Sequence, residues 1–330
     1  MAKLPPDLPP TLVVVVDTEE EFDWGKPFAR HNTAVTSIAE QVRAQDIFAR
    51  FGVRPTYVMD YPVATTEASI RVLDGFWRQG ACDIGTHLHP WVNPPFEEPV
   101  NARNSYPGNL PPDLERRKLE SLTSAIRANF GVQPIAYKAG RYGFGPATAG
   151  ALEQLGYRID LSVVPHTDFG ADGGPDFRCV ADRPFRFGSG SDMLAIPLSR
   201  GFAGAAASIG AGLYPLFDTA LGRKLRIGGI AARSRILERI TLTPEGIDHA
   251  AHRRLTRSLL ARGHRVFSMT YHSSSLGIGH TPYVRNKEDR ARFLSAIESY
   301  LAYFKDAVGG RFGTVFELYD LMMRNRPVAA

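Results

Sequence analysis

Cysteine is scarce in this sequence, and no long apolar segment opens it. The 330 residues include two cysteines, Cys82 and Cys179, too few for a disulfide framework or a cysteine-rich zinc site. We expect both to be unpaired thiols in the core rather than one disulfide. Residues 1–10 lack the continuous apolar stretch of a secretory signal, so we interpret them as a short extended leader and expect a cytoplasmic protein.

One uncharged segment, Phe202–Phe217, has sixteen residues, which is below the roughly twenty needed to cross a bilayer. It is rich in glycine and alanine and fits poorly with the rest of the chain. We interpret residues 200–245 as a helical insertion that is either buried or lies against a membrane, and we favour burial.

Charge is modest in amount, with a net charge of +5, but it is unevenly distributed. Basic residues gather between 223 and 239 and again between 253 and 265. Solvated helix faces explain such groups most simply, and the alternatives are an anionic membrane surface, a lipid-linked or phosphate-bearing substrate, or nucleic acid. No nucleic-acid-binding motif accompanies them, so we expect no nucleic acid partner.

Apolar runs and helix-period stretches alternate along the chain, which is typical of an α/β protein with parallel strands. The length suits one large domain over residues 1–330. The expected strands are 11–16, 53–59, 81–89, 135–139, 157–164, 193–198, 265–272 and 314–318, and the expected helices include 33–51, 65–79, 113–130 and one from 146. Between them, residues 90–113 hold seven prolines and predict a long lid or binding loop.

Two of these strands end in residue types that can bind metals. Asp17 and Glu19 follow the valine run of the first strand and project to the same side, because residues two apart in a strand do so. Two adjacent carboxylates repel unless a cation or a proton lies between them. His87 and His89 end the third strand in the same way. Two histidines and one carboxylate with an open position are the ligands expected of catalytic zinc.

Three further strand ends carry candidate catalytic groups. His272 is a candidate general acid or base, and Asp160 could hold its tautomer. Arg141 can pair with a carboxylate and fix it as an anion. Taken singly, His272 could be a core histidine, Asp160 a turn cap and Arg141 a surface ion pair. Together they place polar groups at successive ends of parallel strands.

The motifs that carry these residues, in order along the chain, resemble those of NodB-homology polysaccharide deacetylases, the carbohydrate esterase family four type. They are Asp17-Thr-Glu19, Asp83-Ile-Gly-Thr-His87-Leu-His89-Pro, Gly140-Arg141-Tyr142-Gly, Asp160-Leu-Ser162 and Tyr271-His272-Ser. Glu19-Glu-Glu-Phe-Asp-Trp24 and Thr86-His-Leu-His-Pro-Trp91 look most like the exopolysaccharide branch. The resemblance implies a distorted (β/α)7 barrel with one divalent metal ion: zinc, with cobalt, nickel or manganese as alternatives.

The resemblance also implies roles at the metal. Asp17 would be the base, with Glu19 and His87 as ligands. The family's second histidine lies four residues after the first, and here Trp91 occupies that position. His89 is the nearby substitute for the missing ligand.

The remaining roles follow in the same way. Held by Asp160, His272 would protonate the leaving group, and Arg141 would orient the base. A backbone N–H near Tyr142 would stabilise the oxyanion. The aromatic and imidazole side chains expected to contact a sugar are Trp91, Tyr142, His280 and Tyr283.

The resemblance implies hydrolytic removal of an N- or O-linked acetyl group from an acetylated sugar or oligosaccharide, such as a precursor of a surface polysaccharide or glycolipid. Two alternatives stay open. One is an allantoinase-like hydrolase of another non-peptide C–N bond. The other is a catalytically degenerate member that only binds carbohydrate, which the tryptophan at a ligand position suggests.

Overall fold

A strongly curled, mostly parallel sheet forms the centre of the computed structural model, which describes residues 8–219, 222 and 224–324. Most of the expected leader, residues 1–10, lies outside the described residues. The main strand order is β10-β1-β2-β3-β4-β5-β7-β6, with β11 also pairing β1. Every pairing in it is parallel except that of β6 with β7. The strands are β1 (Thr11–Thr18), β2 (Thr56–Met59), β3 (Asp83–Leu88), β4 (Ala136–Ala139), β5 (Ile159–Asp160), β6 (Phe185–Phe187), β7 (Met193–Ala195), β10 (Val266–His272) and β11 (Arg311–Phe312).

Two hydrogen bonds connect the segment that follows β7, the last parallel strand of the order, to β10. Ser199, just after β7, donates its N–H to the Ser268 carbonyl oxygen at 3.1 Å, and the Ser268 N–H donates to Ser199 Oγ at 2.9 Å. The predicted fold class, an α/β distorted barrel, is therefore confirmed.

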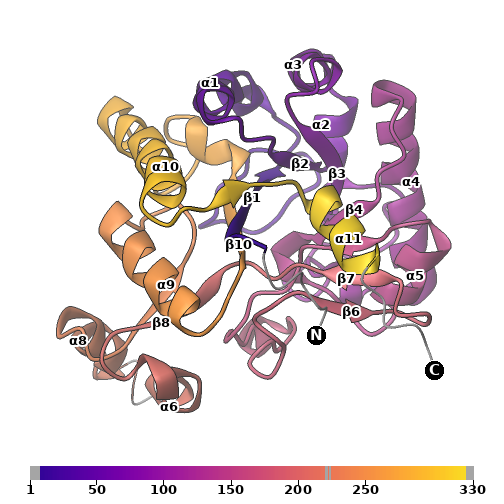
Figure 1. Ribbon diagram of the computed structural model, residues 1–330. Helices are drawn as coiled ribbons and strands as arrows, with labels where there is room; N and C mark the ends of the chain where they lie inside the picture. The colour runs from indigo at the N-terminus through magenta and orange to yellow at the C-terminus, as the bar shows by residue number, and fades with distance from the viewer. Residues whose placement is uncertain (1–7, 220–221, 223, 325–330) are drawn as a thin grey trace.

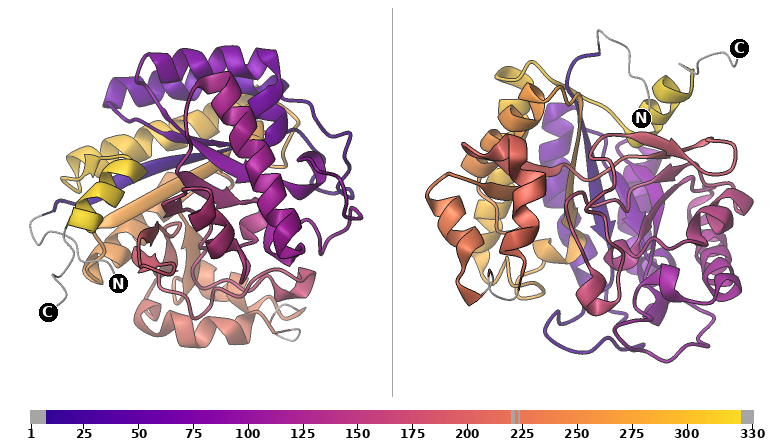
Figure 2. Two further views of the ribbon diagram at one scale, coloured as in Figure 1. Left: turned by 90° about the vertical axis from the view of Figure 1, so that its right-hand side faces the viewer. Right: turned by 90° about the horizontal axis from the view of Figure 1, so that it is seen from below.

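Helices cover the outside of this sheet (Figures 1 and 2). They are α1 (Gln41–Phe51), α2 (Tyr61–Thr65), α3 (Glu67–Arg78), α4 (Pro112–Phe130), α5 (Thr148–Gln154), α9 (His249–Ala261) and α10 (Lys287–Asp306), whereas α11 (Val315–Arg324) packs on the inner face of the sheet. Side-chain oxygens of Asp60, Asp248 and Asn286 cap α2, α9 and α10 by accepting backbone N–H bonds from the first turn.

The two faces of β1 pack in separate clusters, as expected for a strand buried on both sides. Val14 and Val16 belong to the cluster under the outer helices, whereas Val13 and Val15 pack inside the curl against α11. Because side chains alternate along a strand, Asp17 continues the inner row and emerges at its carboxyl end.

Residues 200–245, which we expected to form a helical insertion, contain strands as well as helices. Strands β8 (Arg200–Ala203) and β9 (Glu238–Thr241) form an antiparallel pair, and α6 (Gly210–Phe217) and α8 (Ile227–Arg233) lie together beside it (Figure 1). The preferred burial of Phe202–Phe217 holds for Phe202 and Ala203 of β8 but not for α6, of which only Gly210 is buried. Apolar composition alone did not show that this segment splits into a strand and a short surface helix.

Two smaller predictions are also corrected. Residues 314–318 begin helix α11 instead of forming a strand, because Val315, Leu318 and Met322 are spaced to bury one helical face. Cys82 is buried as expected, but Cys179 is exposed. Within the described ranges, every helix is too short or too polar to span a lipid bilayer.

Candidate functional site

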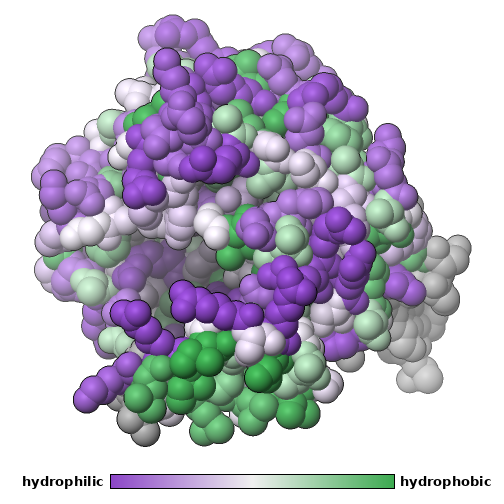
Figure 3. Space-filling model, turned by 90° about the vertical axis from the view of Figure 1, so that its left-hand side faces the viewer, coloured by the Kyte–Doolittle hydropathy of each residue, from purple (hydrophilic) through white to green (hydrophobic). Residues whose placement is uncertain are grey.

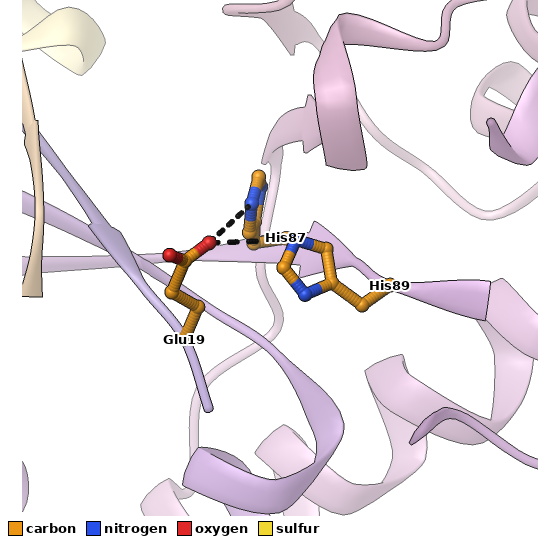
Figure 4. A group of neighbouring side chains, drawn as sticks. All are labelled: Glu19, His87 and His89. Carbon is orange, nitrogen blue, oxygen red and sulfur yellow. Dashed lines mark ion pairs between the residues drawn. The ribbon is translucent and has the colours of Figure 1, made fainter. Parts of the chain in front are cut away.

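Glu19, His87 and His89 converge at the carboxyl ends of β1 and β3 (Figure 4). Glu19 Oε2 lies 3.7 Å from His87 Nε2 and 3.5 Å from His89 Nε2. All three side chains are buried. The structure thus brings together the three residues that the sequence predicted as metal ligands.

The outer nitrogens of both imidazoles have partners, which fixes their tautomers. His87 Nδ1 donates to the backbone oxygen of Lys138 at 3.1 Å, and His89 Nδ1 faces Glu20 Oε2 at 2.7 Å. Burial lowers the pKa of His87, and it lowers the pKa of His89 to about 4, so both rings are neutral at physiological pH. With the proton on Nδ1, each Nε2 presents a lone pair toward Glu19.

Three lone-pair donors that face one another in a buried place fit a divalent cation. An ion held at about 2.1 Å by tetrahedral ligands keeps the ligand atoms about 3.4 Å apart, close to the separations from Glu19. Burial raises the pKa of Glu19, and a cation would reverse that effect. The donor set of two imidazoles and one carboxylate leaves a position open for substrate or water.

Glu20 supports His89 from behind, a role that the sequence did not reveal. Its carboxylate accepts the His89 Nδ1–H and also the Trp91 indole N–H at 2.7 Å. Burial raises the pKa of Glu20 to about 8, and burial together with the Glu20 charge raises the pKa of Asp60 well above its usual range. At least one proton is therefore shared between these two carboxyl groups near neutral pH.

Trp91 is buried and packs against His89, where the sequence led us to expect a side chain open to a sugar. It is 1% exposed and stacks on His89 with ring centroids 4.3 Å apart. Phe28 covers it at 4.4 Å. This packing fixes the plane of the His89 ring.

Asp17 is held by Lys138. The expected partner, Arg141, does not contact it. Lys138 Nζ donates to both carboxylate oxygens of Asp17 at 2.6 and 2.7 Å, and to Thr270 Oγ1 at 3.0 Å. Burial would raise the pKa of Asp17, but the charges of Lys138 and His272 and the hydrogen bonds from Lys138 outweigh it and lower the pKa. Asp17 is therefore an anion with a fixed orientation.

Arg141 points away from this anion because the chain leaves the strand direction there, with a φ of 52° at Arg141. Its guanidinium donates to Ser105 Oγ at 2.7 Å and lies 4.2 Å from the centre of the Tyr106 ring. It therefore ties the site to the proline-rich loop.

Glu245, not Asp160, holds His272. His272 Nδ1 lies 2.9 and 3.0 Å from the two oxygens of Glu245, and Nε2 lies 3.7 Å from Asp17 Oδ2. Burial lowers the pKa of His272, but the charges of Glu245, Glu19 and Asp17 outweigh it and raise the pKa to about 10. The imidazole is therefore protonated over the physiological range.

Asp160 lies on the other side of its strand from the expected position. Ile159 and Leu161 pack with the inner cluster, so the intervening carboxylate points to the opposite face. Its Oδ1 accepts the hydroxyl and the N–H of Ser162 at 2.6 and 3.1 Å. Burial raises its pKa to about 7.

These groups surround a cavity of about 300 Å³. One part of its wall is polar and carries the candidate ligands, Asp17 and His272, while aromatic rings form much of the rest. The lining residues are Asp17, Glu19, Phe22, Trp24, Phe28, His87, His89, Tyr106, Ala139, Arg141, Tyr142, Phe169 and His272.

Among the expected sugar contacts, Tyr142 lines this cavity and stacks on Phe169 with centroids 5.7 Å apart. His280 and Tyr283 do not line it. His280 faces Glu21 at 3.6 Å and borders a neighbouring cavity, and Tyr283 packs against Trp24 at a centroid distance of 5.7 Å. Tyr283 therefore contacts Trp24, a residue of the cavity wall, without lining the cavity itself.

Gly140 is required by the close approach of β4 to the histidine pair. A Cβ there would lie 2.6 Å from His89 Cδ2 and would also collide with the Leu88 carbonyl oxygen. The next two residues, Arg141 and Tyr142, both have positive φ, which is uncommon outside glycine. The chain is thus bent sharply at the mouth of the cavity.

Sequence reasoning missed Glu20, Lys138 and Glu245. A signal for Lys138 was present, since it stands two residues after Ala136 in a strand of buried residues, where an unpaired cation would be costly. Glu245 lies in a loop after β9 with no periodic pattern around it, so only the tertiary fold reveals it.

No protein-family model matches the sequence, and neither does any curated protein. Solved structures do share its fold. A proposed glycoside hydrolase/deacetylase from Parabacteroides distasonis aligns with a TM-score of 0.60 and 11% identity, covering 97% of this chain and 73% of the other. The PuuE allantoinase aligns with a TM-score of 0.57 and 13% identity, covering 98% and 94%.

A proposed polysaccharide deacetylase from Mycobacterium smegmatis aligns over 100% of this chain and 97% of its own, with a TM-score of 0.56 and 14% identity. At such identities the likeness concerns the fold. The chain therefore has the curled α/β fold of polysaccharide deacetylases, with a buried His/Glu cluster suited to a metal ion.

Proposed function

We propose that this protein is a metal-dependent hydrolase that removes an N- or O-linked acetyl group from a sugar. The observation that carries the proposal is the convergence of Glu19, His87 and His89, in which both imidazoles have Nδ1 engaged elsewhere and Nε2 turned toward the Glu19 carboxyl group. They face the same cavity as an oriented carboxylate, Asp17, and a protonated imidazole, His272.

Glu19, His87 and His89 would hold the divalent ion. When bound, such an ion polarises a carbonyl oxygen and acidifies water. Glu20 and the backbone oxygen of Lys138 keep the two imidazoles in the tautomer that binds a metal.

Proton transfer is divided between the other two groups. Asp17 stays ionised beside Lys138 and would accept a proton from the attacking water at Oδ2, the oxygen that faces His272. Held by Glu245, His272 would donate its Nε2 proton to the departing amine or alcohol. The low pKa of one group and the high pKa of the other suit an acid and base pair at neutral pH.

The cavity favours a single sugar unit over a long chain that passes through it. About 300 Å³ is at the small end of ligand pockets. Its aromatic lining, which includes Tyr142 and Trp24, suits the faces of a pyranose ring. The polysaccharide deacetylase and glycoside hydrolase/deacetylase names of two structural neighbours agree with this substrate class.

The test is acetate release from a panel of N- and O-acetylated monosaccharides by the zinc- or cobalt-loaded protein. We expect turnover that Asp17→Asn abolishes while metal stays bound, and that Glu317→Gln, on the remote helix α11, leaves unchanged. Release of product from allantoin but not from acetylated sugars would instead support an amidase like the allantoinase neighbour. An active Asp17→Asn variant would refute the base assignment.

A further inference from the structure

The insertion between β8 and β9 carries most of the large hydrophobic side chains that are exposed in the described part of the chain. Five of the nine large hydrophobic side chains that are exposed among the described residues lie between residues 209 and 236. We call them the apolar patch: Ile209, Leu216, Leu225, Ile230 and Ile236. Leu216 is 61% exposed and Ile230 is 60% exposed, which is a strong departure from their usual burial.

Figure 3 shows this apolar surface as a continuous area on the lower edge of the molecule, with hydrophilic residues along its border. The patch projects outward, because α6 and α8 lie beyond the curled sheet (Figure 1). A protruding convex surface suits insertion into a soft apolar phase.

Four cations lie next to the patch, on its exposed loop and helix ends. Lys224, Arg226, Arg233 and Arg235 are exposed. Within the described part of the chain, none of these four cations takes part in an ion pair with a carboxylate. They are therefore available to an anionic surface.

The acids of this region are engaged elsewhere. Asp218 pairs with Arg239 at 3.1 Å, and Glu238 pairs with Arg254 at 2.8 Å. Apolar side chains flanked by unpaired cations are the signature of a segment that lies in the interface of an anionic membrane.

The insertion is also joined to the candidate active site. Phe202 of β8 packs on the His166 ring with centroids 4.8 Å apart, and Tyr214 of α6 packs on Phe202 at 5.4 Å. His166 begins the segment that contributes Phe169 to the catalytic cavity. A membrane bound at the patch would therefore lie beside the rim of that cavity.

We propose that the apolar patch and its four cations form a docking surface for an anionic lipid membrane. Ile209, Leu216, Leu225, Ile230 and Ile236 enter the interfacial layer, and the cations contact lipid phosphates. This binding is independent of the deacetylase assignment, because it requires neither metal nor turnover.

The test is co-sedimentation of the full 330-residue chain with vesicles of phosphatidylcholine, either pure or mixed with phosphatidylglycerol. We expect binding to the mixed vesicles that weakens as salt is added. Lys224→Gln with Arg226→Gln should weaken it by about fivefold per cation, the equivalent of roughly 1 kcal/mol each. Lys287→Gln with Lys305→Gln, on α10, is the matched control and should change nothing.

The apolar side is tested by Leu216→Ser with Ile230→Ser, which should reduce binding by about tenfold per side chain. Val42→Ser, at an exposed apolar position on α1, is the control. Circular dichroism and thermal unfolding check that each variant is folded, so that a loss of binding is not a loss of structure.

Failure of the wild-type protein to bind mixed vesicles at low salt would overturn the proposal. Equal losses in the patch and control variants would do the same. A third contrary outcome is self-association, in which sedimentation velocity shows a dimer that Leu216→Ser with Ile230→Ser dissociates, because a second copy of the chain would then cover the patch.

Discussion

Glu245→Gln tests whether His272 is a proton donor tuned by its partner. The substitution keeps the shape of the side chain but removes the charge that lies 2.9 Å from His272 Nδ1. The pKa of His272, raised to about 10 by the charges of Glu245, Glu19 and Asp17 against the effect of burial, should fall. A hydrogen bond to a charged group contributes about 1.5–3 kcal/mol, which corresponds to a decrease of about one to two pKa units.

The sign of the effect on activity follows from the role of the group. A general acid works only while it is protonated, so activity is lost as the pH rises through its pKa. The alkaline limb of the profile of kcat/KM against pH should therefore move to lower pH in Glu245→Gln. A cation bound beside Glu19 offsets the effect of the Glu19 charge on the pKa of His272. The alkaline limb of the metal-loaded enzyme should therefore lie at a lower pH than the pKa of His272 titrated in the metal-free protein.

Two assays check this prediction. A proton NMR titration of the metal-free protein, with His272→Gln to assign the signal, gives the pKa without any need for turnover. The pH profile of acetate release gives it in the working enzyme. An unchanged imidazole pKa in Glu245→Gln would refute the coupling, and a lower pKa with an unmoved alkaline limb would show that His272 is not the acid.

Three further substitutions probe the supports of the site. Lys138→Met leaves Asp17 buried without its partner and should lower the free energy of unfolding by about 3–5 kcal/mol, measured by urea denaturation. Glu20→Gln weakens the support of His89 and should reduce metal affinity by about 10- to 100-fold in calorimetric titrations. Gly140→Ala places a methyl group 2.6 Å from His89 Cδ2 and should also weaken metal binding, with little change in the circular dichroism spectrum. Matched controls are Lys287→Met, Glu317→Gln and Gly150→Ala, the last at a glycine where an added Cβ would meet nothing within 4 Å. A Lys138→Met variant as stable as its control, or a Glu20→Gln or Gly140→Ala variant with wild-type metal affinity, would contradict the corresponding contact.

The parts of the fold that the sequence predicts well are those with strong local patterns. The valine run before Asp17 forms a strand buried on both faces, and its position fixes where that carboxylate emerges. The spacing of two residues in His87-Leu-His89 is enough to place both imidazoles on one side, because strand geometry leaves no alternative.

The predictions that failed concern contacts between segments that are distant in the sequence. The partners of His272 and Asp17 are Glu245 and Lys138, more than twenty residues away in sequence, and short motifs contain no record of such pairings. Asp160 was misassigned because a strand of two residues shows no alternation from which its face could be read. A run of apolar residues such as 202–217 likewise does not tell whether its side chains meet the core or the solvent.

The most direct test of the central claim is the metal stoichiometry and affinity of the purified protein, measured by elemental analysis and calorimetric titration with zinc. The account predicts one tightly bound ion per chain, lost in His87→Ala and in His89→Ala but retained in His280→Ala, whose imidazole does not line the cavity. If the wild-type protein binds no divalent ion, or if His89→Ala keeps a full equivalent at unchanged affinity, the proposed metal centre is wrong.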